Sequence, residues 1–257
     1  MAKISLIDEK SIFDTDCDYI VNTINTVGAM GKGIALEFRY RCPSLYDTYL
    51  ELCKNQKIDV GSLFVWDTKK GEYMLVPENT KNRLERTKRD LIHAPDKGKP
   101  TGILNFPTKK DWKLPSRIEY IEAGIKTFSE HYRDLDIKRI AFPKLGATSG
   151  GLKWDEVSKV MYRYLEPLED LYVEIYAYNP KIDDWVFRKL KNALKSAKTA
   201  QSLGLRSNQA KTLSDAINSG KCRSTAELIE WPRIGEKTLN KLYAYAANRS
   251  DNQKGLF

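Results

Sequence analysis

The stretch YIVNTINTVGAMGKGIAL, residues 19–36, decides the fold. It opens with a short apolar run, Tyr19–Val21, which is typical of a buried strand. Three glycines, Gly28, Gly31 and Gly33, follow within six residues, and a helical apolar pattern begins after them. A strand, a glycine-rich turn and a helix N-terminus in this order can hold a phosphate, because free backbone N–H groups and the positive end of the helix dipole face the anion.

A second glycine-rich turn, LGATSGGL at residues 145–152, has the same setting. It follows the apolar run 140–143 and precedes a helical pattern that begins near Lys153. Neither turn carries the Gly-Lys-Ser/Thr ending of a P-loop or the spacing of a dinucleotide fold. Each could be only a tight turn, but two such turns in one α/β domain favour a diphosphate ligand that is held from both sides.

Four motifs, taken in order, resemble the macrodomain family: VNTINTVGAMGKGIALEF, ILNFPTKKDW, PSRIEYIEAGI and FPKLGATSGGLKW. They cover most of residues 1–180 and are most similar to the DarG-type DNA ADP-ribosylglycohydrolase antitoxins. The resemblance implies a three-layer α/β/α sandwich with a mixed sheet, an ADP-ribose pocket, and removal of ADP-ribose from modified DNA bases. It also implies ADP-ribosylated DNA and a cognate DNA ADP-ribosyltransferase toxin as partners, with ADP-ribose as ligand or product and no cofactor.

The resemblance assigns the catalytic role to Lys109. In these antitoxins the lysine of an Asn-Phe-Pro-Thr-Lys motif is catalytic, and residues 105–109 match that motif position by position. An amine beside C1″ of the distal ribose could act as a nucleophile or as a base, and either role needs a fraction of neutral amine. The alternative is a surface lysine in a Lys109–Lys110 pair.

The resemblance assigns the other site residues to ADP-ribose binding. Asp8 resembles the acid that contacts the adenine, although Ile7 replaces the usual glycine before it; the alternative is a solvated acid at a strand end. Asn22 and Asn25 are expected to orient the distal ribose. The remaining residues wrap the ribose and the phosphates: Gly31, Lys32, Gly33, Ile34, Thr108, Leu145, Gly146, Ala147, Thr148, Ser149, Gly150 and Gly151.

One departure from the wider family bears on the substrate. Protein-directed relatives with a catalytic lysine also use an aspartate in the second loop, and no acid occurs between Leu145 and Lys153. This favours the DNA-directed branch over a hydrolase that acts on ADP-ribosylated protein. A non-catalytic reader that docks ADP-ribose on modified DNA or on a toxin stays open.

Charge and composition limit the other function classes. The net charge of the 257 residues is +9, and +8 of it falls after residue 180. Such a basic segment attracts polyanions. The four cysteines and two histidines lack metal-site spacing, which predicts free thiols, a cytoplasmic setting and no metal. No apolar run reaches about 18 residues, so we expect no membrane span, and we expect a monomer.

Periodicity predicts the elements of a first domain over residues 1–180. Strands are expected at 4–7, 19–21, 63–66, 73–76, 103–106, 139–143 and 171–177, and helices at 32–41, 43–55, 115–133 and 153–165. The turn at 69–71 predicts a hairpin. Ser116 and Glu119 have capping-box spacing at the start of the third helix.

Residues 79–100 interrupt this pattern with seven basic and three acidic residues. Loops this long are commonly functional or mobile. One interpretation is a basic arm that contacts DNA phosphate, with Arg83, Arg86 and Lys88 as candidates, and the other is a solvated charged loop.

A second, all-α domain is expected over residues 181–257. Helices are predicted at 184–197 and at 207–218, the latter with Ser207 as N-cap. The segment STAELIEWPRIGEKTLNKLYAYA, residues 224–246, resembles a helix-hairpin-helix, a module that binds the DNA backbone. Its hairpin is usually Pro-Gly-Ile-Gly, and here Arg233 stands at the first glycine position. The DNA-contact candidates are Arg233, Gly235 and Lys237, and the alternative is a plain packing module.

Overall fold

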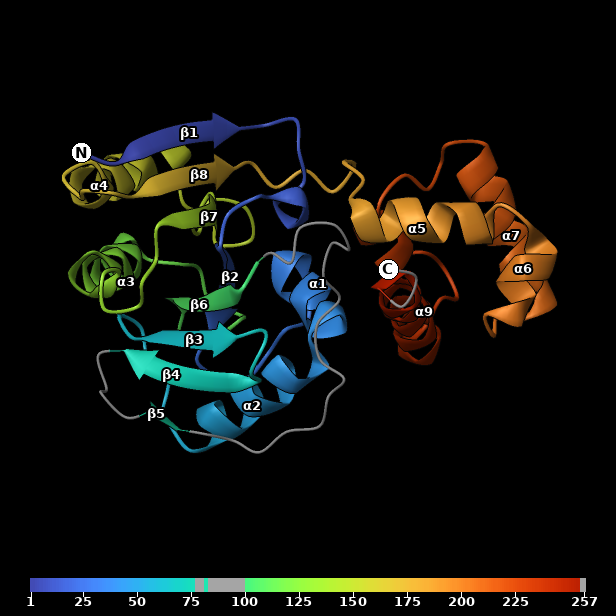
Figure 1. The fold of residues 1–257 in the computed structure, drawn as a ribbon, viewed down its shortest axis with the longest axis horizontal. Helices are drawn as coiled ribbons and strands as arrows, with labels where there is room; N and C mark the ends of the chain where they lie inside the picture. The colour runs from blue at the N-terminus through green and yellow to red at the C-terminus, as the bar shows by residue number, and fades with distance from the viewer. Residues whose placement is uncertain (77–80, 83–99, 255–257) are drawn as a thin grey trace. The chain divides into compact units, whose positions relative to one another are not determined.

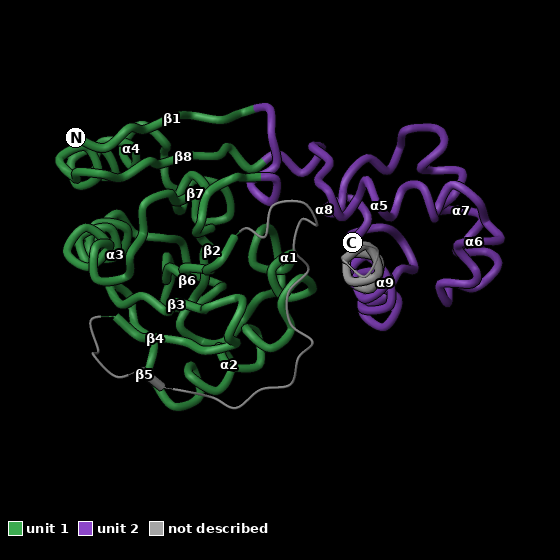
Figure 2. The backbone as a smooth tube through the Cα atoms, in the orientation of Figure 1, with its two compact units in different colours: residues 1–8, 15–90, 99–178 green, residues 9–14, 91–98, 179–257 purple. Residues whose placement is uncertain are grey.

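The computed structural model describes residues 1–76, 81–82 and 100–254. It divides into two compact units, which are coloured separately in Figure 2. The described part of the first unit comprises residues 1–8, 15–76, 81–82 and 100–178. The described part of the second comprises residues 9–14 and 179–254, so it takes in a segment near the N-terminus that the sequence pattern had placed with the first domain.

The first unit is built on one mixed sheet, as expected, and the sheet has eight strands where seven were predicted, because β5 lies within the stretch 79–100 that was expected to be an insertion. The strands lie in the order β1-β8-β7-β2-β6-β3-β4-β5. Pairing is parallel from β1 to β6 and antiparallel from β6 to β5. Their bounds are β1 Lys3–Ile7, β2 Tyr19–Asn25, β3 Leu63–Asp67, β4 Glu72–Val76, β5 Lys81–Asn82, β6 Gly102–Lys109, β7 Arg139–Pro143 and β8 Tyr172–Tyr176.

Helices cover both faces of this sheet (Figure 1). The helices α1 (Gly33–Arg41) and α2 (Pro43–Lys54) lie on one face, and α3 (Ile118–His131) and α4 (Trp154–Leu165) lie on the other. The three-layer arrangement expected from the alternation of strands and helices is therefore present. The hairpin of β3 and β4 forms as predicted, around the turn at residues 68–71.

Apolar side chains between the sheet and α3 form the main core. The rings of Phe128 on α3 and Phe142 on β7 meet edge to face, with centroids 5.4 Å apart. Phe106 on β6 is fully buried beneath Gly124 of α3. Close approach of helix to sheet at this point requires glycine, because a Cβ on Gly124 would lie 2.3 Å from the Phe106 ring.

Two predicted helix caps are wrong. The N-cap of α3 is Arg117, two residues before Glu119, and no side chain caps this helix end. Ser116 lies outside the helix, and its backbone N–H donates to the carbonyl of Gly150 instead. In α7 (Ser207–Asn218), Ser207 is the first helical residue, while Arg206 is the N-cap and its N–H donates to the Gln209 side chain at 2.9 Å.

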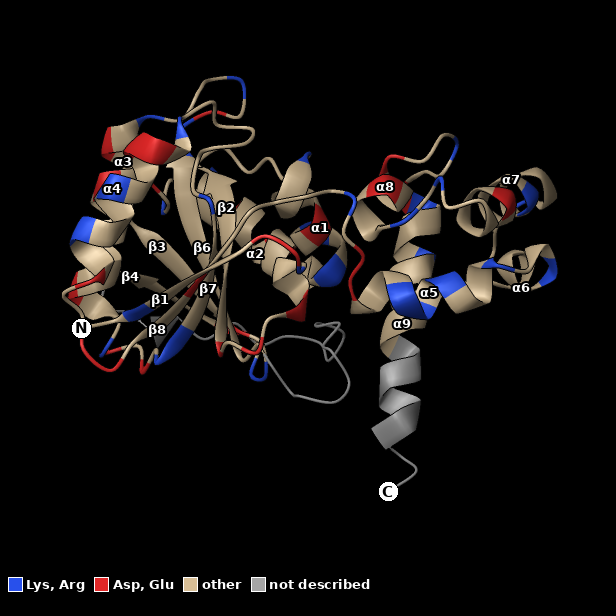
Figure 3. Cartoon of the chain, turned by 90° about the horizontal axis from the view of Figure 1, so that it is seen from above, with Lys and Arg blue, Asp and Glu red and all other residues tan. Residues whose placement is uncertain are grey.

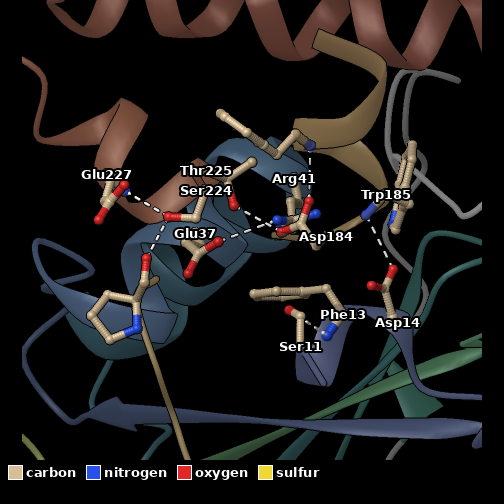
Figure 4. Close-up of polar contacts among 12 residues, drawn as sticks. Ser11, Phe13, Asp14, Glu37, Arg41, Asp184, Trp185, Ser224, Thr225 and Glu227 are labelled. Atoms are coloured by element: carbon tan, nitrogen blue, oxygen red, sulfur yellow. Dashed lines mark hydrogen bonds and ion pairs between the residues drawn. The ribbon is translucent and has the colours of Figure 1, made fainter. Parts of the chain in front are cut away.

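The second unit holds the 3₁₀ turn η1 (Ile12–Asp14) and the helices α5 (Trp185–Leu194), α6 (Ala197–Ser202), α7, α8 (Thr225–Ile229) and α9 (Glu236–Lys254). Asp184 organises its centre (Figure 4). One carboxylate oxygen caps α5 by accepting the Phe187 N–H, and the other accepts the Thr225 hydroxyl at 2.7 Å. Asp14 accepts the Trp185 N–H at 3.1 Å, which joins η1 to α5.

We predict that Gly124→Ala lowers the free energy of unfolding by about 1–3 kcal/mol, because the added methyl overpacks the Phe106 ring. Alanine favours a helix by about 1 kcal/mol over glycine, so a gain would be expected if the site were open. Urea unfolding measures the difference. Glu130→Ala, at an exposed position of the same helix, is the control and should change stability by less than about 0.5 kcal/mol. A Gly124→Ala protein as stable as wild type would contradict this packing argument.

Candidate functional site

The first unit contains a cavity of about 890 Å³ at the carboxyl ends of β2, β6 and β7. Parallel strands end at a common edge, which is where ligands of open α/β sheets bind. The residues that line it are Thr23, Ile24, Asn25, Ala29, Gly31, Lys32, Gly33, Ile34, Ala35, Thr108, Lys109, Trp112, Lys113, Pro143, Lys144, Gly146, Thr148, Ser149, Gly150 and Tyr178.

The first loop of the cavity, residues 26–32 between β2 and α1, is shaped by the Asn25 side chain. Its Oδ1 accepts the N–H groups of Val27 and Ala29, each at 3.1 Å, and its Nδ2 donates to the Ala29 carbonyl at 2.6 Å. The buried Tyr49 hydroxyl donates to the backbone carbonyl of Asn25 at 2.8 Å. The amide thus contributes to the cavity chiefly by holding residues 25–29 in place.

The N-terminus of α1 opens into this cavity. The helix begins at Gly33, whose φ of +58° suits glycine, and its N-cap Lys32 makes no side-chain capping bond. The first backbone N–H groups of a helix have no partner within the helix. Here Gly33, Ile34 and Ala35 supply these groups at the cavity wall, where the helix dipole also favours an anion.

The second loop, residues 145–152, forms the opposite wall. Gly146 has a φ of +63°, and its carbonyl accepts the Leu152 N–H at 3.0 Å. A Cβ on Gly150 would lie 2.2 Å from the Gly146 carbonyl oxygen, so this position also requires glycine. Among the described residues, the N–H groups of Thr148 and Ser149 have no hydrogen-bond partner. They remain available to a ligand.

Lys109 connects the two loops. It is the last residue of β6 and pairs in register with Asn25 of β2. Its Nζ donates to the Ser149 carbonyl at 2.7 Å. Partial burial lowers the pKa of the Lys109 amine from its usual 10.5, because burial disfavours the charged form. The cavity wall therefore carries an amine with more neutral form than an ordinary surface lysine has.

The cavity lining is basic. It includes Lys32, Lys109, Lys113 and Lys144 and no Asp or Glu. The Lys144 amine lies 3.7 Å from a carboxylate oxygen of Asp8, which is 67% exposed and does not line the cavity. The combination of unpaired N–H groups and lysine amines suits a ligand with more than one phosphate.

Asn22 lies away from this cavity, contrary to the role expected for it. Its side chain is fully buried within the sheet, and its Nδ2 donates to Asn105 Oδ1 at 2.8 Å. Asn105 in turn donates to the Phe64 carbonyl at 3.0 Å. The pair joins β2, β6 and β3, so Asn22 supports the strands beneath the site.

Eleven of the seventeen predicted site residues line the cavity and six do not: Ile7, Asp8, Asn22, Leu145, Ala147 and Gly151. The cavity adds residues that the motif comparison missed, chiefly Trp112, Lys113, Lys144 and Tyr178. Trp112 and Lys113 follow the end of the lysine motif by three and four residues, and a tryptophan this close to a predicted strand end was an available signal.

Of the candidate DNA contacts, Arg83, Arg86 and Lys88 lie outside the described residues. Arg233 and Gly235 are exposed at the turn between α8 and α9 in the second unit, and Lys237 is exposed in the first turn of α9. Lys and Arg also mark α5 and α6 of this unit (Figure 3). Within the described residues, no group of three His, Cys, Asp or Glu side chains could hold a metal ion, and no helix is long and apolar enough to cross a membrane.

Fold and cavity together define an α/β/α domain with two glycine loops on opposite walls of one cavity, an arrangement that suits a phosphate-bearing ligand. Comparison with known proteins gives the family. The model of the Macro domain matches residues 78–161. The macrodomain of Mycobacterium tuberculosis DarG shares 32% sequence identity and a TM-score of 0.55, over 70% of this chain and the whole of that one. The chain therefore belongs to the macrodomain family and, within it, to the group of DarG macrodomains.

Two further relatives are longer than that domain. The DNA ADP-ribosyl glycohydrolase of Thermus aquaticus is 35% identical over 192 residues, which are 74% of this chain and 46% of the relative. The structure of Thermosipho africanus DarTG in complex with ADP-ribose is 31% identical with a TM-score of 0.56, over 73% of this chain and 44% of that one. The chain thus spans less than half the length of the curated relatives it matches.

We predict that Lys109 titrates below the usual lysine value of 10.5 in the folded protein. Because the folded pKa is lower than the unfolded one, the protonated amine costs stability. That cost is present below the folded pKa and disappears as the pH rises past it toward the unfolded value. NMR of ¹³Cε-labelled lysine across pH 7–12 measures the titration, and the resonance missing from Lys109→Arg identifies it. A midpoint at or above 10.5 would contradict the prediction.

Proposed function

We propose that this protein is a hydrolase that removes ADP-ribose from modified DNA bases, and that Lys109 carries the reaction. The observation that supports this most is the position of the Lys109 amine, at the cavity wall between two phosphate-type loops. The names given to relatives of this protein agree with the proposal. The Thermus aquaticus relative is a DNA ADP-ribosyl glycohydrolase, and the Thermosipho africanus relative was solved with ADP-ribose.

The proposed chemistry breaks the N-glycosidic bond between C1″ of the distal ribose and a base nitrogen. The N–H groups of the two loops bind the diphosphate, and this places the ribose beside Lys109. In one route the neutral amine attacks C1″ as the bond to the base nitrogen breaks, the base leaves with a proton from that amine, and water then hydrolyses the lysine–C1″ bond to release ADP-ribose. In the other route the amine takes a proton from a water that attacks C1″ and passes it to the leaving base nitrogen. The lowered pKa of Lys109 favours both routes, and no cofactor or metal is needed.

The absence of carboxylates from the cavity lining supports a DNA substrate over a protein one. An aspartate in the second loop accompanies the lysine in protein-directed relatives, and here neither that loop nor the rest of the lining holds one. Basic residues at the wall also suit a nucleic acid strand.

We also propose an antitoxin role. A relative in Thermosipho africanus is a fusion of a DNA ADP-ribosyl transferase with a DNA ADP-ribosyl glycohydrolase, 34% identical over 168 residues. A hydrolase of this kind would reverse the product of a cognate transferase, which makes such a toxin the expected partner. The free cysteines suit a cytoplasmic location, and we expect the protein to act as a monomer.

The second unit is proposed to bind the DNA backbone as a helix-hairpin-helix. The helices α8 and α9 are joined by the turn at residues 230–235, and the Arg233 carbonyl accepts a bond from the Gln209 side chain at 2.5 Å. Arg233 has a φ of +66°, a conformation that favours glycine. This backbone conformation costs an arginine free energy that a glycine would not lose. A contact between the Arg233 guanidinium and a DNA phosphate would explain why arginine occupies the position.

Lys109→Ala should lower turnover of an ADP-ribosylated oligonucleotide by about 10²–10⁴-fold, since that is the usual contribution of such a group. Affinity for free ADP-ribose should stay within a few-fold, because binding and bond breaking use different groups. In the wild type, turnover should rise with pH with a midpoint below pH 10.5, as the neutral fraction of the amine grows.

Gel mobility of the oligonucleotide measures the release of ADP-ribose, and calorimetry measures its affinity. Lys110→Ala is the matched control, because Lys110 is exposed and does not line the cavity. Unchanged turnover in Lys109→Ala would remove this lysine from the mechanism. A stable complex with modified DNA that releases no ADP-ribose would instead identify a reader.

Arg233→Gly separates a phosphate contact from a packing role in the second unit. Glycine relieves the positive φ, so stability should not fall, whereas DNA binding should lose about one phosphate contact. The slope of log K against log salt should then decrease in magnitude by about 0.9. Lys181→Ala, an exposed lysine of the same unit, is the control. An unchanged slope in Arg233→Gly would count against the hairpin as the DNA contact.

A further inference from the structure

Trp112 leaves a large aromatic surface in water. It is 58% exposed, whereas Trp66 is fully buried and Trp185 is nearly so. An exposed tryptophan does not contribute the stability that burial of its apolar surface would provide. Tryptophan is enriched at binding surfaces, so one exposed beside a cavity is a typical recognition element. Trp112 has no part in the phosphate loops or in the amine chemistry described above.

The position of Trp112 is defined by the turn that holds it. The Asp111 side chain accepts the Lys113 N–H at 2.9 Å, and the Asp111 carbonyl accepts the Leu114 N–H at 3.1 Å. This turn starts two residues after Lys109, and Trp112 lines the same cavity as Lys109. The ring is therefore presented at the site by an ordered turn directly linked to the end of β6.

The positively charged side chain of Lys113 lies beside the Trp112 ring. The Lys113 amine is 5.4 Å from its centroid, and Lys113 forms no ion pair with any described residue. The lining has four lysines and no carboxylate, whereas a diphosphate brings only about two negative charges, one for each phosphate. A strand of DNA that continues from the modified base would supply further phosphates for this side of the cavity.

We propose that Trp112 is the platform on which the nucleobase carrying ADP-ribose stacks, with Lys113 beside the adjacent backbone phosphate. This inference rests on the proposed function. A base inside a duplex is already stacked on its neighbours, so the platform requires a base that is unpaired or turned out of the helix. The modified base is accordingly held by stacking on Trp112 while N–H groups hold the diphosphate, and a single strand presents such a base without the cost of turning it out of a duplex.

The first test compares Trp112→Ala, Trp112→Phe and Leu114→Ala on an ADP-ribosylated single-stranded oligonucleotide. Loss of one base–aromatic stack should raise the KM of Trp112→Ala by about five- to a hundred-fold, with kcat within about three-fold of wild type. Phenylalanine should restore most of the loss. Leu114→Ala is the control, since Leu114 is 56% exposed in the same turn and does not line the cavity.

The affinity for free ADP-ribose distinguishes a contact between Trp112 and the base from a contact between Trp112 and ADP-ribose itself. Its affinity should change by less than about two-fold in Trp112→Ala, because the platform is assigned to the base and not to the adenosine diphosphate. An equal loss for free ADP-ribose and for the oligonucleotide would place Trp112 in the ADP-ribose pocket and overturn the proposal. A KM equal to that of wild type would also overturn it.

A second measurement is independent of turnover. Unmodified oligothymidine should quench the tryptophan fluorescence of the full chain more strongly in the wild type than in Trp112→Phe, and a duplex of the same length should not produce this difference. If no variant or wild-type protein releases ADP-ribose but the quenching difference is present, the proposed hydrolase function fails and the platform stands. If release occurs without the quenching difference, the platform fails and the hydrolase function stands.

Discussion

The parallel pairing of β2 with β6 is the constraint on which the site depends. Its register sets Asn22 opposite Asn105 and, after an irregularity between Ile24 and Asn25, sets Asn25 opposite Lys109. This shift of one residue places Asn25, after which the first loop begins, and the Lys109 amine at the same edge of the sheet. The buried Asn22–Asn105 bond lies within the regular part of this pairing, where a slip would leave the Asn22 amide without its partner.

The part of this arrangement that could be predicted from sequence is the part fixed by local chemistry. Glycines at residues 31, 33, 146 and 150 predicted two turns at strand ends, and the structure sets these turns opposite each other across one cavity. The hairpin of β3 and β4 followed from two β-rich runs and the Lys-Lys-Gly turn between them in the same way. These features depend on a few neighbouring residues, so their sequence signal is strong.

The roles of single polar side chains could not be predicted, because they depend on tertiary partners. Asn22 and Asn25 are three residues apart and looked equivalent, yet one bonds across the sheet and the other shapes its own loop. Ser116 has capping-box spacing, but its N–H bonds the second loop, which is distant in sequence. The membership of Glu9–Asp14 in the second unit is also set by long-range contacts, here the bonds of Asp14 to Trp185 and Arg188.

An anionic ligand and a neutral amine at Lys109, as proposed above, make opposing demands. Bound phosphates raise the pKa of a nearby lysine, because their negative charge favours the ammonium form. In the proposed complex the loops would reduce this effect, because they offer neutral N–H groups and a helix dipole to the negative charge of the diphosphate. Lys32 and Lys144 add positive charge elsewhere on the wall. Lys109, which bonds only a carbonyl among the described residues, is left with no carboxylate partner to keep it protonated, and this is the condition under which its burial can favour the neutral form.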